Sequence, residues 1–140
     1  MYQQMIFVNL PVENIEASRA FYTALGYSVN EQFSDESTAS VVISDTIIAM
    51  LLTKEKYAQF TKKEIADARK TSAVLLALSA ESREKVDTLV EKALAAGGSV
   101  AGDTQDLGFM YGRSFDDLDG HTWEVVWMDP AAGDGRAGRV

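Results

Sequence analysis

The stretches Leu25-Gly26-Tyr27-Ser28-Val29 and Ala96-Gly97-Gly98-Ser99-Val100 are alike and lie 71 residues apart in the 140-residue chain. Each follows a segment whose apolar residues recur at spacings of three and four, and each opens a β-rich segment. Apolar residues at that spacing indicate an amphipathic helix, and glycine is a common helix stop. The two stretches therefore predict the same helix-to-strand junction twice, in a duplicated chain.

The first predicted unit covers residues 5–53. Its opening run, Met5–Val12, is apolar and β-rich, and Asn14 can cap a helix that stops at Gly26. Three β-rich segments follow the helix: residues 27–33, 39–43 and 46–53. One strand, one helix and three strands predict a helix packed on one face of a small antiparallel meander.

The second predicted unit covers residues 73–128 and has the same order of elements. We expect a strand at Ala73–Leu78 and a helix at Ser82–Ala96, with Asp119-Gly120 as a hairpin turn. The remaining predicted strands are residues 99–102, 108–115 and 122–128. Both units are expected to form a single α+β domain over residues 1–130.

The segment that joins the units, residues 54–72, is predicted to be a linker. It begins with a short helix, Lys54–Phe60, in which Tyr57 and Phe60 are expected to point inward, and continues as a charged run. The Gly- and Ala-rich end of the chain, residues 131–140, is predicted to be a flexible tail.

Composition excludes several classes of partner and chemistry. Lys and Arg number 13 against 21 Asp and Glu, a formal net charge of −8 that repels a phosphate backbone, so no nucleic acid is expected. Apolar runs are too short to predict a membrane span. The chain has no cysteine, which rules out a thiolate nucleophile and fits a reducing compartment, so a cytoplasmic location is expected.

Two further stretches are more distinctive. Residues 8–22 (VNLPVENIEASRAFY) contain Ser-x-x-Phe-Tyr, and residues 109–126 (FMYGRSFDDLDGHTWEVV) contain Phe-x-Asp-x-x-Gly-x-x-x-Glu. In this order across a duplicated chain, they resemble the vicinal oxygen chelate superfamily, which includes glyoxalase I, extradiol dioxygenases and bleomycin-resistance proteins. The resemblance covers residues 5–129. It implies two tandem βαβββ units that form a curved mixed sheet with a concave pocket, a glyoxalase-like fold.

The resemblance also says where metal ligands would stand. Catalytic members commonly use a His on the first strand and a Glu on the last strand of each unit. Here these positions hold Phe7, an apolar residue near Met50 or Leu51, Ala73 and Glu124. Of these, only Glu124 has the oxygen or nitrogen donors that divalent ions prefer. The sequence therefore predicts no metal cofactor, with Glu124 as the ligand if a divalent metal does bind.

Without a metal, the predicted pocket combines apolar side chains with a few polar ones. Its expected ligand-binding residues are Phe7, Asn9, Met50, Phe109, Tyr111 and Arg113, together with Glu124. Alternation places Tyr111 and Arg113 on one face of their strand, and the sequence leaves open whether that face lines the pocket. If it does, Glu124 would either ionise against Arg113 or have a raised pKa.

Three functional interpretations follow. The first is a small-molecule-binding protein of the bleomycin-resistance type, which lacks the metal. The second is a metal-dependent or atypical lyase or dioxygenase, with Glu124 as the catalytic acid or base. The third is a fold retained for another role. His121, the only histidine, is expected to diverge from Glu124, because residues three apart on a strand face opposite ways. The resemblance further implies a homodimer.

Overall fold

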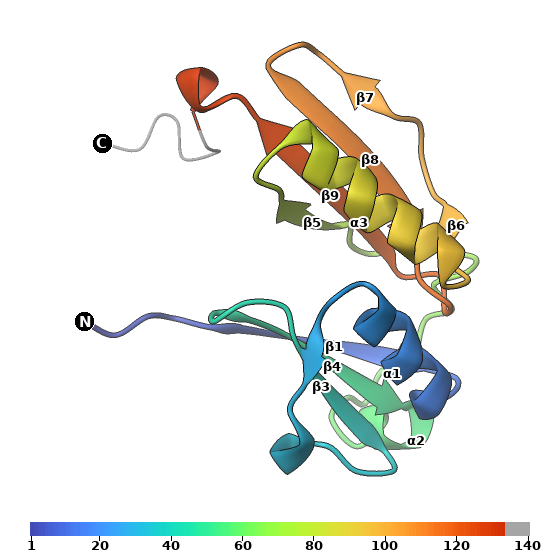
Figure 1. The fold of residues 1–140 in the computed structure, drawn as a ribbon. Helices are drawn as coiled ribbons and strands as arrows, with labels where there is room; N and C mark the ends of the chain where they lie inside the picture. Colours follow the sequence, from blue (N-terminus) through green and yellow to red (C-terminus); the bar gives the residue numbers. More distant parts are fainter. Residues whose placement is uncertain (134–140) are drawn as a thin grey trace. The chain divides into compact units, whose positions relative to one another are not determined.

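The structure, a computed structural model, describes residues 1–133. The chain divides into two compact units (Figure 1). Unit 1 is Met1–Thr71, and unit 2 begins at Ser72. The division falls at the end of the predicted linker. The predicted tail, residues 131–140, lies outside the described residues from 134 onward.

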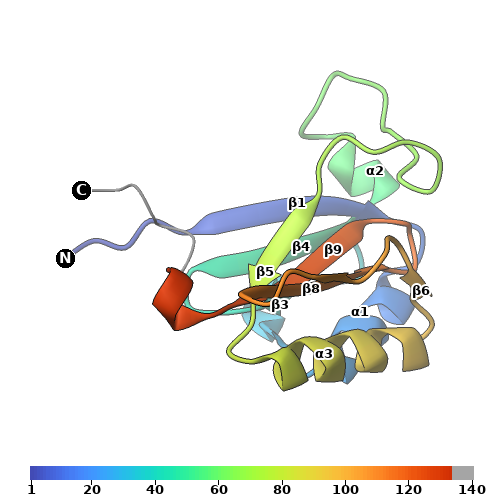
Figure 2. The same ribbon diagram turned by 90° about the horizontal axis from the view of Figure 1, so that it is seen from above.

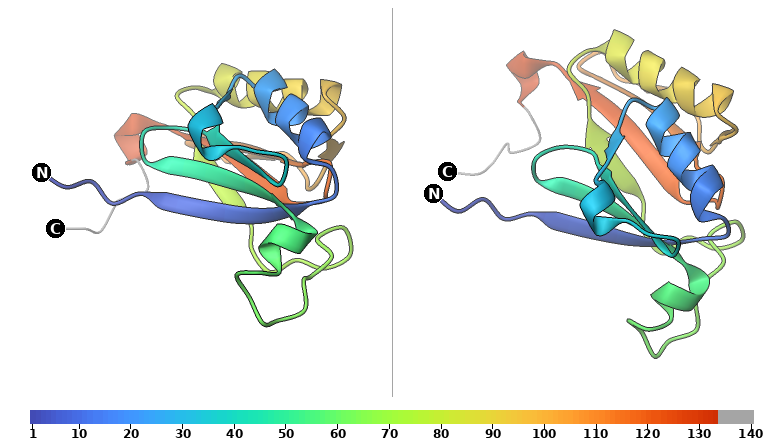
Figure 3. Two further views of the ribbon diagram at one scale, coloured as in Figure 1. Left: turned by 90° about the horizontal axis from the view of Figure 1, so that it is seen from below. Right: turned by 60° about the horizontal axis from the view of Figure 1, so that its bottom comes forward.

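Unit 1 is a four-stranded sheet with a helix on one face. Its elements are β1 (Ile6–Val12), α1 (Ile15–Ala24), β2 (Ser28–Val29), the 3-10 turn η1 (Glu31–Phe33), β3 (Thr38–Val42), β4 (Ile47–Thr53) and α2 (Lys54–Tyr57). The strand order is β1-β4-β3-β2, with β1 parallel to β4 and the other pairs antiparallel. Within this unit, α1 and the short α2 lie on opposite sides of the sheet (Figure 3).

Helix α1 begins after the predicted cap, Asn14, and ends before the predicted glycine stop, Gly26. The Asn14 side-chain oxygen accepts a hydrogen bond from the Ala17 amide at 3.0 Å, which satisfies a free donor of the first turn. Gly26 follows the helix with φ 106°, a conformation that glycine adopts without strain. The helix buries its apolar face against alternate residues of the strands: Leu10, Val12, Ala39, Val41, Ala49 and Leu51.

Unit 2 repeats this plan with one additional strand. Its elements are β5 (Leu76–Ser79), α3 (Arg83–Ala95), β6 (Ser99–Val100), β7 (Gln105–Asp106), β8 (Met110–Asp116), β9 (Thr122–Met128) and the 3-10 turn η2 (Pro130–Ala132). The strand order is β5-β9-β8-β6, with β5 parallel to β9, and β7 pairs with β8. Helix α3 runs along one face of this sheet (Figure 2).

The core of unit 2 lies between α3 and the β8–β9 hairpin. Val86, Val90 and Ala93 of α3 are fully buried, as are alternate residues of the two strands: Phe115, Trp123 and Val125. The tight turn between β8 and β9 uses Gly120 at φ 87°, as the Asp-Gly pair predicts.

The α+β class and the duplicated order of elements are confirmed, and several local predictions are wrong. The strand expected at 27–33 shortens to β2 and continues as η1. Phe60 does not point inward, since 70% of it is exposed. Strand β5 begins at Leu76 rather than Ala73, and β7 lies between two predicted strands, where no strand was predicted. Among residues 1–133, no helix has the length and apolar character needed to cross a membrane.

Candidate functional site

Glu124 lies on the face of the unit 2 sheet that points away from α3. It is the cross-strand partner of Ser114, whereas its strand neighbour Val125 is buried on the α3 side. A hollow of about 270 Å³ opens on the Glu124 face. Its walls are Gly102, Asp103, Gln105, Met110, Gly112, Arg113, Ser114, Glu124 and Val126. All of these residues belong to unit 2, so this unit alone forms the hollow.

The floor of the hollow is bare because β8 has a glycine there. A Cβ added to Gly112 would stand 3.6 Å from Val126 Cγ2, an ordinary contact, and would project over this face. Beside it, Ser114 Oγ accepts a hydrogen bond from the Gly102 amide at 2.9 Å and so ties the β6–β7 segment to β8. Within residues 1–133 the Ser114 hydroxyl donates to no acceptor, so its proton is available to a ligand.

Two carboxylates line the hollow without protein partners. Within the described residues, neither Glu124 nor Asp103 makes an ion pair or a side-chain hydrogen bond. Acidic groups that do pair lie elsewhere on unit 2, on α3 and β7. The hollow thus presents negative charge that no basic side chain of residues 1–133 neutralises.

Tyr111 and Arg113 do share one face of β8, and that face packs on α3. The Tyr111 hydroxyl donates to Asp87 at 2.7 Å, and Arg113 forms ion pairs with Asp87 at 2.9 Å and Glu91 at 2.8 Å. The hydrogen bond from Tyr111, and then the one from Arg113, lowers the pKa of Asp87. The structure therefore separates the Arg113 guanidinium from Glu124, and the Glu124–Arg113 pair considered from the sequence does not form.

Three predicted site residues lie on unit 1, on the sheet face opposite α1. Asn9 of β1 is the register partner of Met50 on β4, and Phe7, two residues earlier, is 56% exposed. Asn9 also lines a second hollow, of about 400 Å³. The other walls of that hollow are Leu52, Tyr57, Phe60 and Thr61. The last predicted residue, Phe109, stands just before β8, 47% exposed, and does not line either hollow.

The strand pairing within each unit shows which residues occupy the positions where the resemblance places metal ligands. In unit 2, Ala77 pairs with Glu124, as Asn9 pairs with Met50 in unit 1. Phe7, two residues before Asn9, therefore corresponds to Leu75, two residues before Ala77, and not to Ala73. Phe7 and Leu75 have no donor atoms, and a Met thioether is a poor ligand for hard divalent ions. These residues do not fit a metal centre of the type that the resemblance implies.

Other side chains of residues 1–133 do not offer an alternative set of metal ligands. No three His, Cys, Asp or Glu residues in the described part of the chain lie close enough together to hold an ion. His121 stands in the turn before β9, where its amide donates to Asp117 and its carbonyl accepts from the Asp117 amide, each at 2.9 Å.

Sequence reasoning missed the walls that Asp103 and Gln105 supply to the Glu124 hollow. Asp103 and Gln105 lie in a segment with no alternation or apolar residues to indicate a strand, and β7 is two residues long. Ser114 could have been found, because the Asp119-Gly120 turn sets the register that places it opposite Glu124.

Comparison with known proteins agrees with this architecture. Residues 4–44 match a family model described as bleomycin resistance protein-like N-terminal. Hypothetical protein SA1046 from S. aureus is 29% identical, with a TM-score of 0.75 over 91% of this chain and 94% of that one. A glyoxalase/bleomycin resistance protein/dioxygenase family enzyme from Burkholderia phytofirmans PsJN is 20% identical, with a TM-score of 0.73 over 90% and 99% of the two chains.

A third structure, a glyoxalase-related enzyme from Fulvimarina pelagi, is 20% identical, with a TM-score of 0.75 over 90% of this chain and 88% of that one. This chain has the vicinal oxygen chelate fold. No curated protein matches the sequence. Since the vicinal oxygen chelate fold supports different chemistries, the function has to be argued from the residues of the site.

Proposed function

We propose that this chain binds a small organic molecule without a metal ion, in the hollow beside Glu124. The observation that carries the proposal is a carboxylate on an open sheet face, above the bare backbone of Gly112, with no protein partner among residues 1–133. A half-buried carboxylate without a protein partner favours a ligand group that can donate to it.

The walls of the hollow indicate the chemistry of the ligand. Glu124 and Asp103 supply negative charge, while Met110 and Val126 supply apolar surface. The guanidinium of Arg113 is bonded to α3 and does not offset that charge. We therefore propose an organic cation, with an apolar group beside the positive charge. A volume of about 270 Å³ suits a small molecule or one group of a larger compound.

The experiment is an NMR titration of amide shifts with benzyltrimethylammonium, in the presence of EDTA. The expected result is saturable shifts at residues 112–114 and 124, with little response to phenylmethanesulfonate, which has a similar skeleton and the opposite charge. Glu124→Gln should weaken binding of the cation, and Gly112→Val should block the hollow. Equal responses to both compounds, or an unaffected Glu124→Gln variant, would contradict the proposal.

A second candidate function is acid or base catalysis by Glu124. The Ser114 hydroxyl is its cross-strand neighbour, so the hollow holds a proton donor beside a carboxylate. A lyase or dioxygenase-like reaction on a bound substrate would lose its turnover in Glu124→Gln. Turnover that survives this substitution would remove Glu124 from the mechanism.

We also propose that the protein is a cytoplasmic homodimer. The support is the resemblance, together with the absence of cysteine. Light scattering after gel filtration should give twice the 15.3 kDa mass of one chain, and a mass of a single chain would contradict the dimer.

A further inference from the structure

Strand β7 connects the Glu124 hollow to the opposite face of the same sheet. Its two residues pair with successive residues of β8, Gln105 with Gly112 and Asp106 with Tyr111. Because successive side chains on a strand point to opposite faces, Gln105 lines the hollow while Asp106 points to the α3 side. Whatever holds Asp106 therefore also holds a wall of the hollow.

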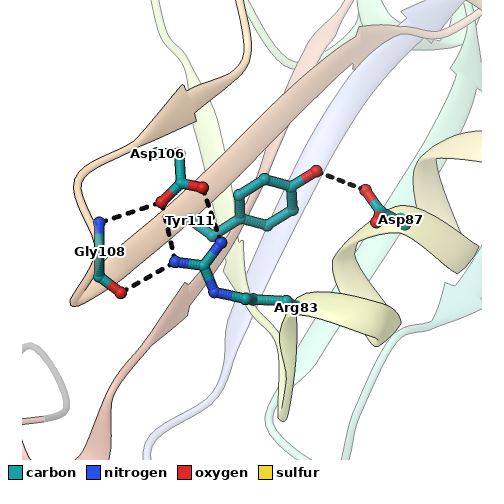
Figure 4. Close-up of polar contacts among 5 residues, drawn as sticks. All are labelled: Arg83, Asp87, Asp106, Gly108 and Tyr111. Atoms are coloured by element: carbon teal, nitrogen blue, oxygen red, sulfur yellow. Dashed lines mark hydrogen bonds and ion pairs between the residues drawn. The ribbon is translucent and has the colours of Figure 1, made fainter.

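Arg83, the first residue of α3, holds Asp106. Its guanidinium donates two parallel hydrogen bonds of 2.8 Å to the two Asp106 carboxylate oxygens, and a third of 2.9 Å to the Gly108 carbonyl (Figure 4). The same Asp106 carboxylate accepts from the Gly108 amide at 3.0 Å. This bidentate geometry is the strongest form of Arg–carboxylate pair. We call these three residues, with their hydrogen bonds, the Arg83 clamp.

Two aromatic rings orient the guanidinium. Arg83 Cζ lies 5.0 Å from the centre of the Tyr111 ring and 5.1 Å from that of Trp127. Tyr111 is itself tied to α3 through its hydrogen bond to Asp87, as Figure 4 shows. Stacking on Tyr111 and Trp127 reduces the entropy that an arginine loses on pairing, so this exposed ion pair should be more persistent than an isolated one.

The position of Arg83 argues against a role in stabilising its own helix. It follows the N-cap Ser82, at the end of α3 where the helix dipole is positive and a cation is unfavourable. A residue that breaks a local preference is expected to be compensated elsewhere in the fold. Here the compensation is the contact with the Asp106–Gly108 turn, across 23 residues of sequence.

The segment that the clamp holds has little other anchorage. Every residue from 101 to 109 is exposed, so no buried apolar side chain fixes it to the unit. Apart from the two-residue β7 ladder, its attachments include the Gly102–Ser114 hydrogen bond and a 2.8 Å bond from the Leu107 amide to the Met110 carbonyl. Segments with few buried contacts open at low free energy.

We propose that Arg83 is a positioning residue for the Glu124 hollow: through Asp106 and Gly108, it holds the 102–106 wall in place from the far side of the sheet. Arg83 does not touch the ligand. Removing the clamp lets the wall open, which separates Asp103 and Gln105 from Glu124 and weakens binding. This inference rests on the proposed function for its effect on binding, and on the structure alone for its effect on the wall.

The first test is hydrogen exchange of the full chain, which needs no ligand. Arg83→Met keeps an apolar stem against Tyr111 and Trp127 but removes all three hydrogen bonds. We expect at least a tenfold rise in the exchange rate of amides 105–107, with α3 and β9 unchanged. Asp106→Asn should produce a similar rise, and the double variant no more than either single one. Unchanged exchange in a folded Arg83→Met protein would overturn the clamp.

The second test measures the affinity for benzyltrimethylammonium in the same variants. Arg83→Met should raise the dissociation constant by at least fivefold, and Arg83→Lys, which keeps the charge without the bidentate geometry, should raise it by less. The matched control is Arg19→Met, since Arg19 pairs with Glu31 at 2.6 Å in unit 1 and should leave both readouts unchanged. Faster exchange with unaltered affinity would overturn the positioning role.

The two tests separate failure of this inference from failure of the proposed function. If the wild-type chain does not bind the cation, the proposed function is wrong, and the exchange rates still decide whether Arg83 holds the wall. If Arg83→Met does not fold, Arg83→Lys and Asp106→Asn carry both measurements.

Discussion

Gln105 and Asp106 are adjacent in the sequence and lie on opposite faces of one sheet. The side chain of one lines the hollow, and that of the other accepts two hydrogen bonds from Arg83. Arg113 and Ser114 likewise lie on opposite faces of the sheet. The Arg113 guanidinium pairs with Asp87 of α3, and the Ser114 hydroxyl lies beside Glu124. For each of these residues, the sheet face on which the side chain lies therefore decides which groups it can contact.

The Asp106 carboxyl should titrate at a low pH. The hydrogen bonds from Arg83, and then the one from the Gly108 amide, lower its pKa from 3.8 to about 2. Because the pKa is lower in the folded chain, the clamp stabilises fully above the unfolded value near 3.8, and this stabilisation is lost as the pH falls through about 2. Carbon NMR of the side-chain carboxyl should give this titration directly.

In Arg83→Met, the pKa of Asp106 should rise toward 3.8 but stop below it, because the Gly108 amide still donates. The control is Asp35 in unit 1, whose pKa is lowered by hydrogen bonds from Ser37 and should not respond to the substitution. An Asp106 titration that is the same with and without Arg83 would show that the clamp does not form in solution.

At the scale of elements, the two units use the same device to end their first helix. Gly26 and Gly97 have φ values of 106° and 109°, which residues with a side chain rarely adopt. Their surroundings differ. A Cβ on Gly26 would meet nothing within 4 Å, whereas a Cβ on Gly97 would stand 3.1 Å from Leu118 Cδ2.

Gly26→Ala and Gly97→Ala should both destabilise, by unequal amounts. Each substitution costs on the order of 1 kcal/mol for the backbone conformation alone. Gly97→Ala should cost more, since Leu118 has to move as well. Urea unfolding gives the two changes in free energy, and Leu118→Val in the Gly97→Ala background should recover the excess. Equal costs at both glycines would indicate that Leu118 moves aside freely.

At the scale of the whole molecule, the repeat allows one unit to be compared with the other. Equivalent registers place Met50 and Glu124 at one pair of positions and Phe7 and Leu75 at another. Three of these four side chains are apolar or thioether, so the donor set of a catalytic vicinal oxygen chelate centre is not present at these positions.

The protein should therefore bind its ligand in the absence of metal. Calorimetric titration with Ni²⁺, Zn²⁺, Mn²⁺ and Fe²⁺ should show no tight binding of one ion per chain. EDTA should leave the affinity for benzyltrimethylammonium unchanged. One tightly bound ion that is lost in Glu124→Gln would contradict this prediction and restore the enzyme interpretation.

Much of the fold follows from local sequence. The caps at Asn14 and Ser82 and the glycine stops set the helix limits to within a residue or two, and β9 covers the predicted residues 122–128. These signals act between neighbours along the chain, so they can be read in order. Strand β7 and the late start of β5 could not be predicted, because short strands depend on pairing with β8 and β9.

Patterns along the chain predict the duplication, the α+β order of elements and the strand that carries Glu124, but one of the four ligand positions expected from the resemblance was assigned to Ala73 instead of Leu75. The face of β8 that packs on α3 could not be predicted from the sequence, and this packing separates Tyr111 and Arg113 from Glu124. Side chains on a strand alternate with a period of two whichever face is buried, so the alternation does not show which face meets the helix. The contact of Arg83 with Asp106 likewise required the fold, since it joins two residues that no local pattern relates.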